Sequence, residues 1–182
     1  RIDFPDGYSM KWLGEYKAST DSNKYLFRSL PIAVIFMFAL LVFLFRDFNK
    51  PLIIFLSLPL QYIGIVMGIF VSGKPFSFVA VVGALGLIGM MIKNGVVLID
   101  EITAQIKTGV EPVEALLSAS SSRLRPVMMA SGTTILGMIP LISDAMFGPM
   151  AVAIMGGLLV GTIITLMIIP VFYALFFNIK CD

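Results

Sequence analysis

The chain has no histidine and a single cysteine, Cys181. Charged residues make up 13% of its 182 residues, about half of the roughly 25% found in soluble domains. Without histidine, neither Ser/His nor Cys/His catalysis can operate within this chain, and one cysteine supplies neither a zinc site nor a disulfide framework. The net charge of +2 is too small to indicate a nucleic-acid partner. We therefore predict no enzyme, no metal site and no cofactor.

What the sequence has instead is apolar residues, at 58% of the chain with a mean hydropathy of +0.98. Charged residues divide it into apolar stretches, and a helix of about 17–25 apolar residues crosses a bilayer. The last uncharged run, 35 residues long, begins with a turn signal at Met146–Pro149 and predicts one long, tilted helix. The fold class is therefore all-α membrane protein, with five transmembrane helices over about 28–46, 51–72, 76–100, 126–144 and 149–178.

Two further segments complete the predicted organisation. Residues 1–25 are polar and begin with arginine, so we expect the end of an extracytoplasmic domain, cut from a longer chain, ahead of a transmembrane domain over 26–179. Residues 112–124 begin with a proline, which can open a helix, and place apolar residues near one face. This pattern predicts a short helix lying at the cytoplasmic interface.

The basic residues of the short loops predict the orientation. Lysine and arginine concentrate in cytoplasmic loops, and Lys74 is the only one on the opposite side. With five spans, the N-terminal segment then lies outside and the C-terminus inside. The residues predicted to be cytoplasmic are Arg46, Lys50, Lys107, Arg123, Arg125 and Lys180.

Lys93 is the one charge between Pro75 and Ile99. On a helix, Gly86, Gly89 and Asp100 lie within about 60° of arc of it. Small residues mark faces where helices pack closely, so we expect Lys93 to point into the bundle. Ionisable residues inside membrane helices are functional by default.

No acidic partner for Lys93 is evident. Its helical neighbours at three and four positions are apolar, and Asp100 lies roughly 10 Å along the axis. Either another part of the protein supplies the carboxylate, or burial keeps the lysine neutral. Both alternatives indicate that Lys93 takes part in proton transfer. A third alternative is that the side chain extends to the lipid headgroups without a function.

Residues 89–100, GMMIKNGVVLID, resemble the Lys-Asn helix of RND (resistance–nodulation–division) multidrug efflux transporters, in the hydrophobe/amphiphile, acriflavine-resistance pump-like branch. The resemblance covers essentially the whole chain, in order and with matching spacing. The further matching motifs are Gly7-Tyr8, Phe45–Phe48, Leu58–Leu60, Arg123–Pro126, Ile135–Leu141, Met155–Gly157 and Ile169–Phe172.

The resemblance implies a trimeric, proton-driven antiporter of the Gram-negative bacterial inner membrane that exports drugs or other amphiphilic compounds. This chain would be its C-terminal transmembrane part, with a periplasmic N-terminal segment and a cytoplasmic C-terminus. Implied partners are the N-terminal half of the pump, with two aspartates facing Lys93, a periplasmic adaptor (membrane fusion) protein and an outer-membrane channel.

The same resemblance assigns a proton relay to Lys93, Asn94, Arg123 and Ser131. Lys93 would pair with the aspartates in alternation, and Asn94 would be a polar neighbour. Arg123 is equally well explained as a cytoplasmic anchor. Many members have a relay threonine where this chain has Ala130, so Ser131 is the substitute weighed against simple packing. For Thr133 and Thr134 we expect hydrogen bonds to their own helix backbone.

Three alternatives remain open at this point. A related RND-superfamily machine for export or lipid transfer would use a similar bundle, and a stand-alone structural or channel protein would leave Lys93 unpaired. The heavy-metal branch is a minor alternative, because the twelve methionines are scattered as packing residues. Gly64-x-x-x-Gly68 and Gly157-x-x-x-Gly161 are interpreted as helix-packing motifs. Nothing in the sequence identifies a substrate.

Overall fold

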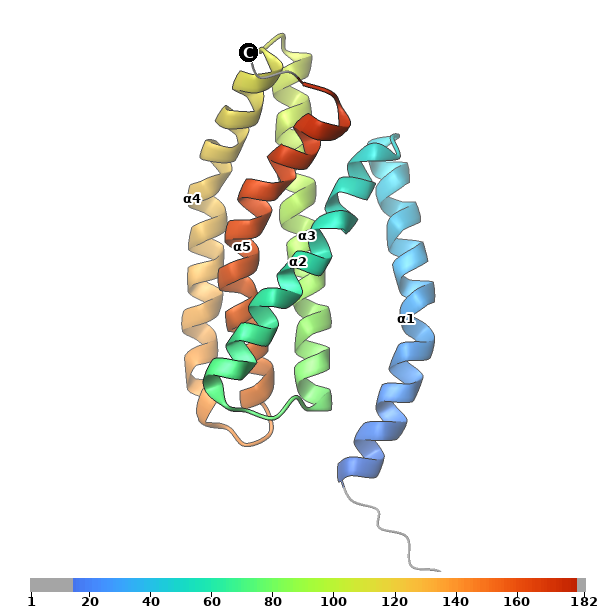
Figure 1. Ribbon diagram of the computed structural model, residues 1–182, viewed down its shortest axis with the longest axis vertical. Helices are drawn as coiled ribbons and strands as arrows, with labels where there is room; N and C mark the ends of the chain where they lie inside the picture. The colour runs from blue at the N-terminus through green and yellow to red at the C-terminus, as the bar shows by residue number, and fades with distance from the viewer. Residues whose placement is uncertain (1–14, 180–182) are drawn as a thin grey trace, which may run out of the picture.

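The computed structural model describes residues 15–179, which are almost entirely helical (Figure 1). Five helices are long and apolar enough to cross a membrane, and the predicted fold class is confirmed. The elements in chain order are α1 (Glu15–Phe45), α2 (Asn49–Ser72), α3 (Phe78–Lys107), α4 (Pro112–Met138), the short 3-10 helix η1 (Ile139–Ser143) and α5 (Gly148–Phe176).

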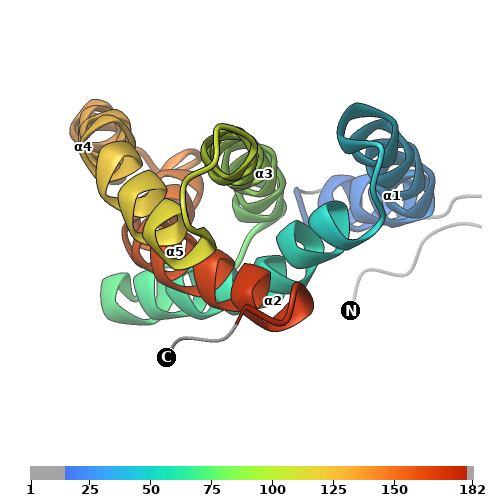
Figure 2. The ribbon, with the colours of Figure 1, turned by 90° about the horizontal axis from the view of Figure 1, so that it is seen from above.

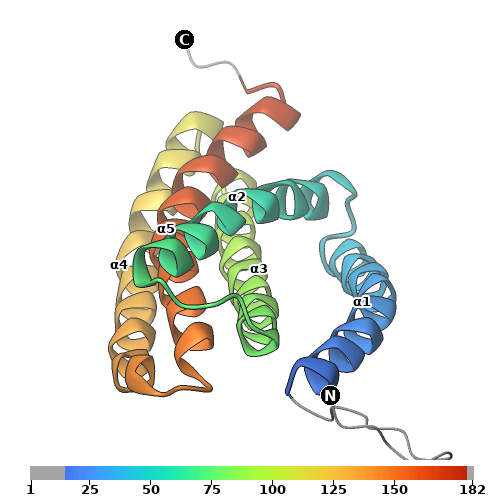
Figure 3. The same cartoon turned by 60° about the horizontal axis from the view of Figure 1, so that its bottom comes forward.

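The helices form a compact group of four and an outlying fifth. Helices α3, α4 and α5 run side by side, and α2 crosses them obliquely (Figure 2). Helix α5 contacts α2, α3 and α4 and has buried residues along its whole length, while Leu159, Ile163 and Met167 are more than half exposed. Helix α1 contacts only α2 and α3, and Figure 3 shows it standing apart from α4 and α5.

The ends of the bundle follow the charge pattern of the sequence. The turns α1–α2 and α3–α4 lie at one end, the upper end in Figure 1, together with Arg46, Lys50 and Lys107. The α2–α3 loop, with Lys74, lies at the other end. Which end faces the cytoplasm remains the prediction made from the loop charges.

Glycines bring α2 and α5 into backbone contact. A Cβ atom added at Gly64 would lie 2.8 Å from the Gly156 carbonyl oxygen, and one added at Gly68 would lie 3.0 Å from Gly156 Cα. A Cβ at Gly157 would lie 2.8 Å from the Ile65 side chain. Close approach of this kind requires glycine. The interpretation of these glycines as packing motifs within the bundle is confirmed.

The predicted break before Pro126 is wrong. Helix α4 runs through Pro126 without interruption, although an interior proline costs about 3 kcal/mol. The residues before it explain the difference, because Leu116 and Ala119 are buried in one cluster with Ile102 of α3 and Tyr173 of α5. Packing of these preceding residues offsets its cost. The residues predicted as a separate interfacial helix are thus the first turns of α4.

Asp144 shapes the turn between η1 and α5. Its Oδ1 atom accepts hydrogen bonds from the backbone amides of Phe147, at 2.7 Å, and Met146, at 2.8 Å. These two bonds hold the pKa of the Asp144 carboxyl below its ordinary value. The bonds hold the turn that leads into α5, which begins at Gly148, inside the Met146–Pro149 segment that was predicted as a turn.

We expect Asp144→Ala to lower the thermal unfolding midpoint at neutral pH. Because the pKa is lower in the folded state, the stabilisation is complete above the ordinary aspartate pKa and disappears as the pH falls through the folded-state value. The difference between wild type and variant, measured by unfolding in detergent from pH 7 to pH 3, should therefore vanish at the acid end. A difference that is constant with pH would contradict the role of the carboxylate.

Candidate functional site

Lys93 lies in the middle of α3 on a side where no other described helix packs closely, since α1 faces the neighbouring Gly89 only across a cavity. It is exposed, as are Gly86 and Gly89 on the same face, and a Cβ added at either glycine would have no atom within 4 Å. Met91, about 200° away around the helix, is 1% exposed and packs against α5. Helix α3 therefore buries one side and leaves the Lys93 side open.

The expectation that Lys93 points into the bundle is therefore not met by residues 15–179. Across these residues Lys93 makes neither an ion pair nor a hydrogen bond, and the exposed Asp100 makes none either. Gly86 and Gly89 leave room for a closely packed helix on this face, but no described helix packs against them. The close packing predicted for this face therefore stays a prediction.

Asn94, the second predicted relay residue, follows Lys93 on α3. Its side chain is half-buried and makes no hydrogen bond within the described part of the chain. It lies about 100° from Lys93 around the helix, so it borders the open face. The structure thus places these two neighbours together, and their part in proton transfer remains a prediction.

Arg123 joins α4 to α3. Its Nη2 atom donates to Glu101 Oε2, and this is the one ion pair among residues 19–179, whose side chains the structure describes. Gln105 Nε2 donates to the other Glu101 oxygen at 3.1 Å. The arginine and glutamate side chains are 36% and 27% exposed, so the pair adds at most about 1 kcal/mol. Sequence reasoning missed Glu101, although its position just after the apolar run could have suggested a partner for Arg123.

Ser131 lies in a different interface from Lys93. It is 6% exposed, and its Oγ atom shares a hydrogen bond of 2.8 Å with Thr162 Oγ1 of α5. Thr133 and Thr134 both donate to the Ala130 carbonyl oxygen, which confirms their expected backbone bonds. The structure therefore does not bring Ser131 to Lys93, and its relay role remains a prediction without a contact that supports it.

We expect Ser131→Ala to lower the stability of the bundle by about 0.6 kcal/mol, the average for interhelical hydrogen bonds in membrane proteins. Thr162→Val should cost a similar amount, and the double variant little more, because both remove the same bond. Unfolding by titrated denaturant in micelles would measure this. Thr133→Ala, which removes only a bond within α4, is the matched control. Strictly additive losses would show that the two hydroxyls act separately.

A second polar group lies in the core between α2, α3 and α5. Gln61 Nε2 donates to Thr165 Oγ1 at 3.5 Å, and the Thr165 hydroxyl lies 3.8 Å from Met91 Sδ. Gln61 and Thr165 are each 2% exposed. Interhelical polar contacts of this kind fix the rotation of membrane helices. The sequence analysis did not single out these residues, since isolated polar residues in apolar runs carry no spacing signal.

Comparison with known proteins supports the resemblance to RND transporters, while the hydrophobe/amphiphile branch stays a prediction. Residues 1–177 match the AcrB/AcrD/AcrF family. The chain is 35% identical over 179 residues to the swarming motility protein SwrC of Bacillus subtilis (strain 168). It is 29% identical over 180 residues to the cobalt-zinc-cadmium resistance protein CzcA of Cupriavidus metallidurans (strain ATCC 43123 / DSM 2839 / NBRC 102507 / CH34). These alignments cover 95% and 96% of this chain and 17% of each relative.

The fold is also that of a known transporter. A crystal structure of a heavy metal efflux pump superposes with a TM-score of 0.79 at 24% identity, over 97% of this chain and 18% of that one. The arrangement of the helices thus agrees with the family match. The chain is a multi-pass membrane segment that belongs to the AcrB/AcrD/AcrF family of RND efflux pumps.

Proposed function

We propose that this chain is the C-terminal transmembrane part of a proton-driven RND antiporter, and that Lys93 is the cation of its coupling site. The observation that carries the proposal is the open face of α3, where Lys93 is exposed beside two glycines with empty surroundings. A charged lysine at the centre of a bilayer costs at least about 2.5–3.5 kcal/mol. A helix with carboxylates that covers this face would remove that cost.

The proposed coupling cycle follows from charge balance at this face. With its carboxylate partners ionised, the Lys93 ammonium pairs with them. When a carboxylate takes a proton from the extracytoplasmic side, the pair is weakened and the helices that carry the two groups can move apart. Release of the proton to the cytoplasm restores the pair. Asn94 would supply a polar neighbour, and the Arg123–Glu101 pair would hold α4 to α3 on the cytoplasmic side.

For the transported substrate, we propose drugs or other amphiphilic compounds, as the motifs around Lys93 imply. Export of divalent metal ions is the second candidate, because one relative is named for cobalt, zinc and cadmium resistance and the structural neighbour is a heavy metal efflux pump. Assembly as a homotrimer in a bacterial inner membrane, with an adaptor protein and an outer-membrane channel, belongs to the same proposal. It rests on the family of the chain.

Proton flux measured in liposomes tests this function. The full-length transporter is reconstituted with an internal pH-sensitive dye, and a pH gradient is imposed across the membrane. Addition of a cationic amphiphilic dye should increase proton movement, and salts of cobalt, zinc or cadmium should not. Increased flux with the metal salts alone would favour the second candidate. Absence of any substrate-dependent proton flux would overturn proton antiport itself.

A further inference from the structure

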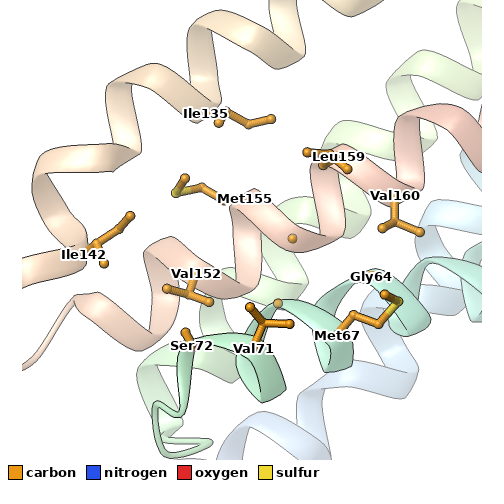
Figure 4. A pocket seen from close by; sticks show the side chains of 12 residues that line it. Gly64, Met67, Val71, Ser72, Ile135, Ile142, Val152, Met155, Leu159 and Val160 are labelled. Atoms are coloured by element: carbon orange, nitrogen blue, oxygen red, sulfur yellow. The ribbon is translucent and has the colours of Figure 1, made fainter.

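An apolar groove runs along the outside of the bundle between α2 and α4, with α5 as its floor (Figure 4). Met67 and Val71 of α2 form one wall, Ile135 and Ile142 form the other, and Met155 and Leu159 of α5 lie between them. The cavity volume is about 450 Å³, and Ser72 is the only lining residue with a polar side chain. The groove is open to its surroundings, since Val71 is 82% and Leu159 56% exposed.

The lining of the groove favours a flexible, apolar occupant. Its side chains are apolar apart from Ser72. The methionine side chains of Met67 and Met155 adapt readily to a thin, flexible chain such as an acyl chain.

A lysine lies beside one end of this groove. Ser72 and Ile142 line that end, and Lys74 follows two residues after Ser72. A Cβ atom added at Gly148 would lie 3.2 Å from Lys74 Nζ and 2.9 Å from the Ile142 carbonyl oxygen. Lys74 Nζ and the Ile142 backbone are therefore near each other. The ammonium group is thus within a few ångströms of the groove end. It is the only basic group in the two loops here, residues 73–77 and 144–147.

Lys74 forms no ion pair with an acidic side chain in the described part of the chain. Asp144 in the neighbouring loop is near enough for the Lys74 charge to contribute to its lowered pKa, but its Oδ1 atom accepts from two backbone amides rather than from Lys74. Lys74 is half-buried and makes no side-chain hydrogen bond within residues 15–179. Its three donors therefore remain available for an anionic group.

We propose that this groove is a binding site for an anionic phospholipid. One acyl chain lies in the groove between α2 and α4, and the phosphate of the headgroup binds the Lys74 ammonium. The combination of an apolar groove within the membrane-spanning part and an ammonium group without an ion pair at its end matches the two parts of such a lipid. A basic residue at a membrane surface favours anionic lipid over neutral lipid. The site is independent of the proposed coupling at Lys93.

Photocrosslinking in the full-length transporter tests the site. The protein is reconstituted in nanodiscs of phosphatidylcholine with a minority of phosphatidylglycerol, and the photoreactive residue p-benzoylphenylalanine replaces Leu159 in the groove. The matched control carries it at Leu136, which is also an exposed leucine but does not line the groove. Mass spectrometry of the illuminated protein identifies each adduct and the lipid headgroup in it.

At Leu159 we expect lipid adducts with phosphatidylglycerol enriched about fivefold over the nanodisc composition, which corresponds to about 1 kcal/mol per basic residue. At Leu136 the adducts should follow the nanodisc composition. Lys74→Gln should abolish the enrichment at Leu159 without abolishing the adducts. Crosslinks from Leu159 to a peptide of the transporter would show that protein fills the groove. Adducts at the bulk lipid ratio, or enrichment that survives Lys74→Gln, would equally overturn the proposal.

Discussion

Replacing Lys93 with alanine in the full-length transporter is expected to lower proton-coupled export by at least about 100-fold. Removing one partner of a buried ion pair costs about 3–5 kcal/mol, because the other charge remains in the membrane without compensation. In the variant, the carboxylates facing α3 would stay protonated, and the proton gradient could no longer drive a conformational change. Export and proton uptake, measured together in liposomes, should fall in parallel.

The controls for this prediction lie on the same helix. Lys107→Ala removes an exposed lysine from the last turn of α3 and should leave export unchanged. Lys93→Arg keeps the charge but changes its hydrogen-bond geometry, so we expect a partial loss. The amount of inserted, folded protein should be equal in all variants. Normal export by Lys93→Ala in properly inserted protein would remove Lys93 from the coupling site.

The second large effect concerns folding. A Cβ atom at Gly156 would lie 2.7 Å from the Gly64 carbonyl oxygen and 2.7 Å from Gly68 Cα. Both are backbone atoms, so α2 and α5 must separate to admit even one methyl group. Overpacking typically costs about 1–3 kcal/mol and occasionally more. We expect Gly156→Ala to destabilise the bundle by about 3 kcal/mol in denaturant titrations.

The matched control is Gly137→Ala in α4. An added Cβ there meets no atom within 4 Å, and alanine favours a helix over glycine by about 1 kcal/mol. The two substitutions are chemically identical and should therefore change stability in opposite directions. If Gly156→Ala were as stable as the wild type, the close crossing of α2 and α5 would not exist in the membrane.

The spans were predictable from the sequence because each is a property of one helix. Charges in an apolar chain are costly, so the intervals between Arg28, Arg46, Lys50 and Lys74 identify where helices cross the membrane. The same reasoning singled out Lys93 as the one charge inside a span. These inferences need only local composition and the period of a helix, which the sequence contains.

The contacts between helices were not predictable in the same way. The bonds Ser131–Thr162 and Arg123–Glu101 join residues 31 and 22 positions apart, and they depend on how α3, α4 and α5 rotate against one another. Gly86 and Gly89 indicated a packed face, but an added Cβ at either glycine meets no atom of the described residues within 4 Å. Pro126 predicted a break that packing of the preceding residues prevents.

The continuity of α4 has a consequence for the shape of the protein outside the bilayer. From Pro112 to Arg125 the helix is about 20 Å long, and its apolar part begins only after that. If the apolar part fills the hydrocarbon layer, these first turns extend beyond it into water. The ion pair with Glu101 and the core around Leu116 hold them rigidly against the rest of the bundle. In a variant with Thr108 replaced by cysteine and Cys181 by serine, the new thiol would then react with a membrane-impermeant reagent from one side only. The orientation predicted from the loop charges makes that side the cytoplasm.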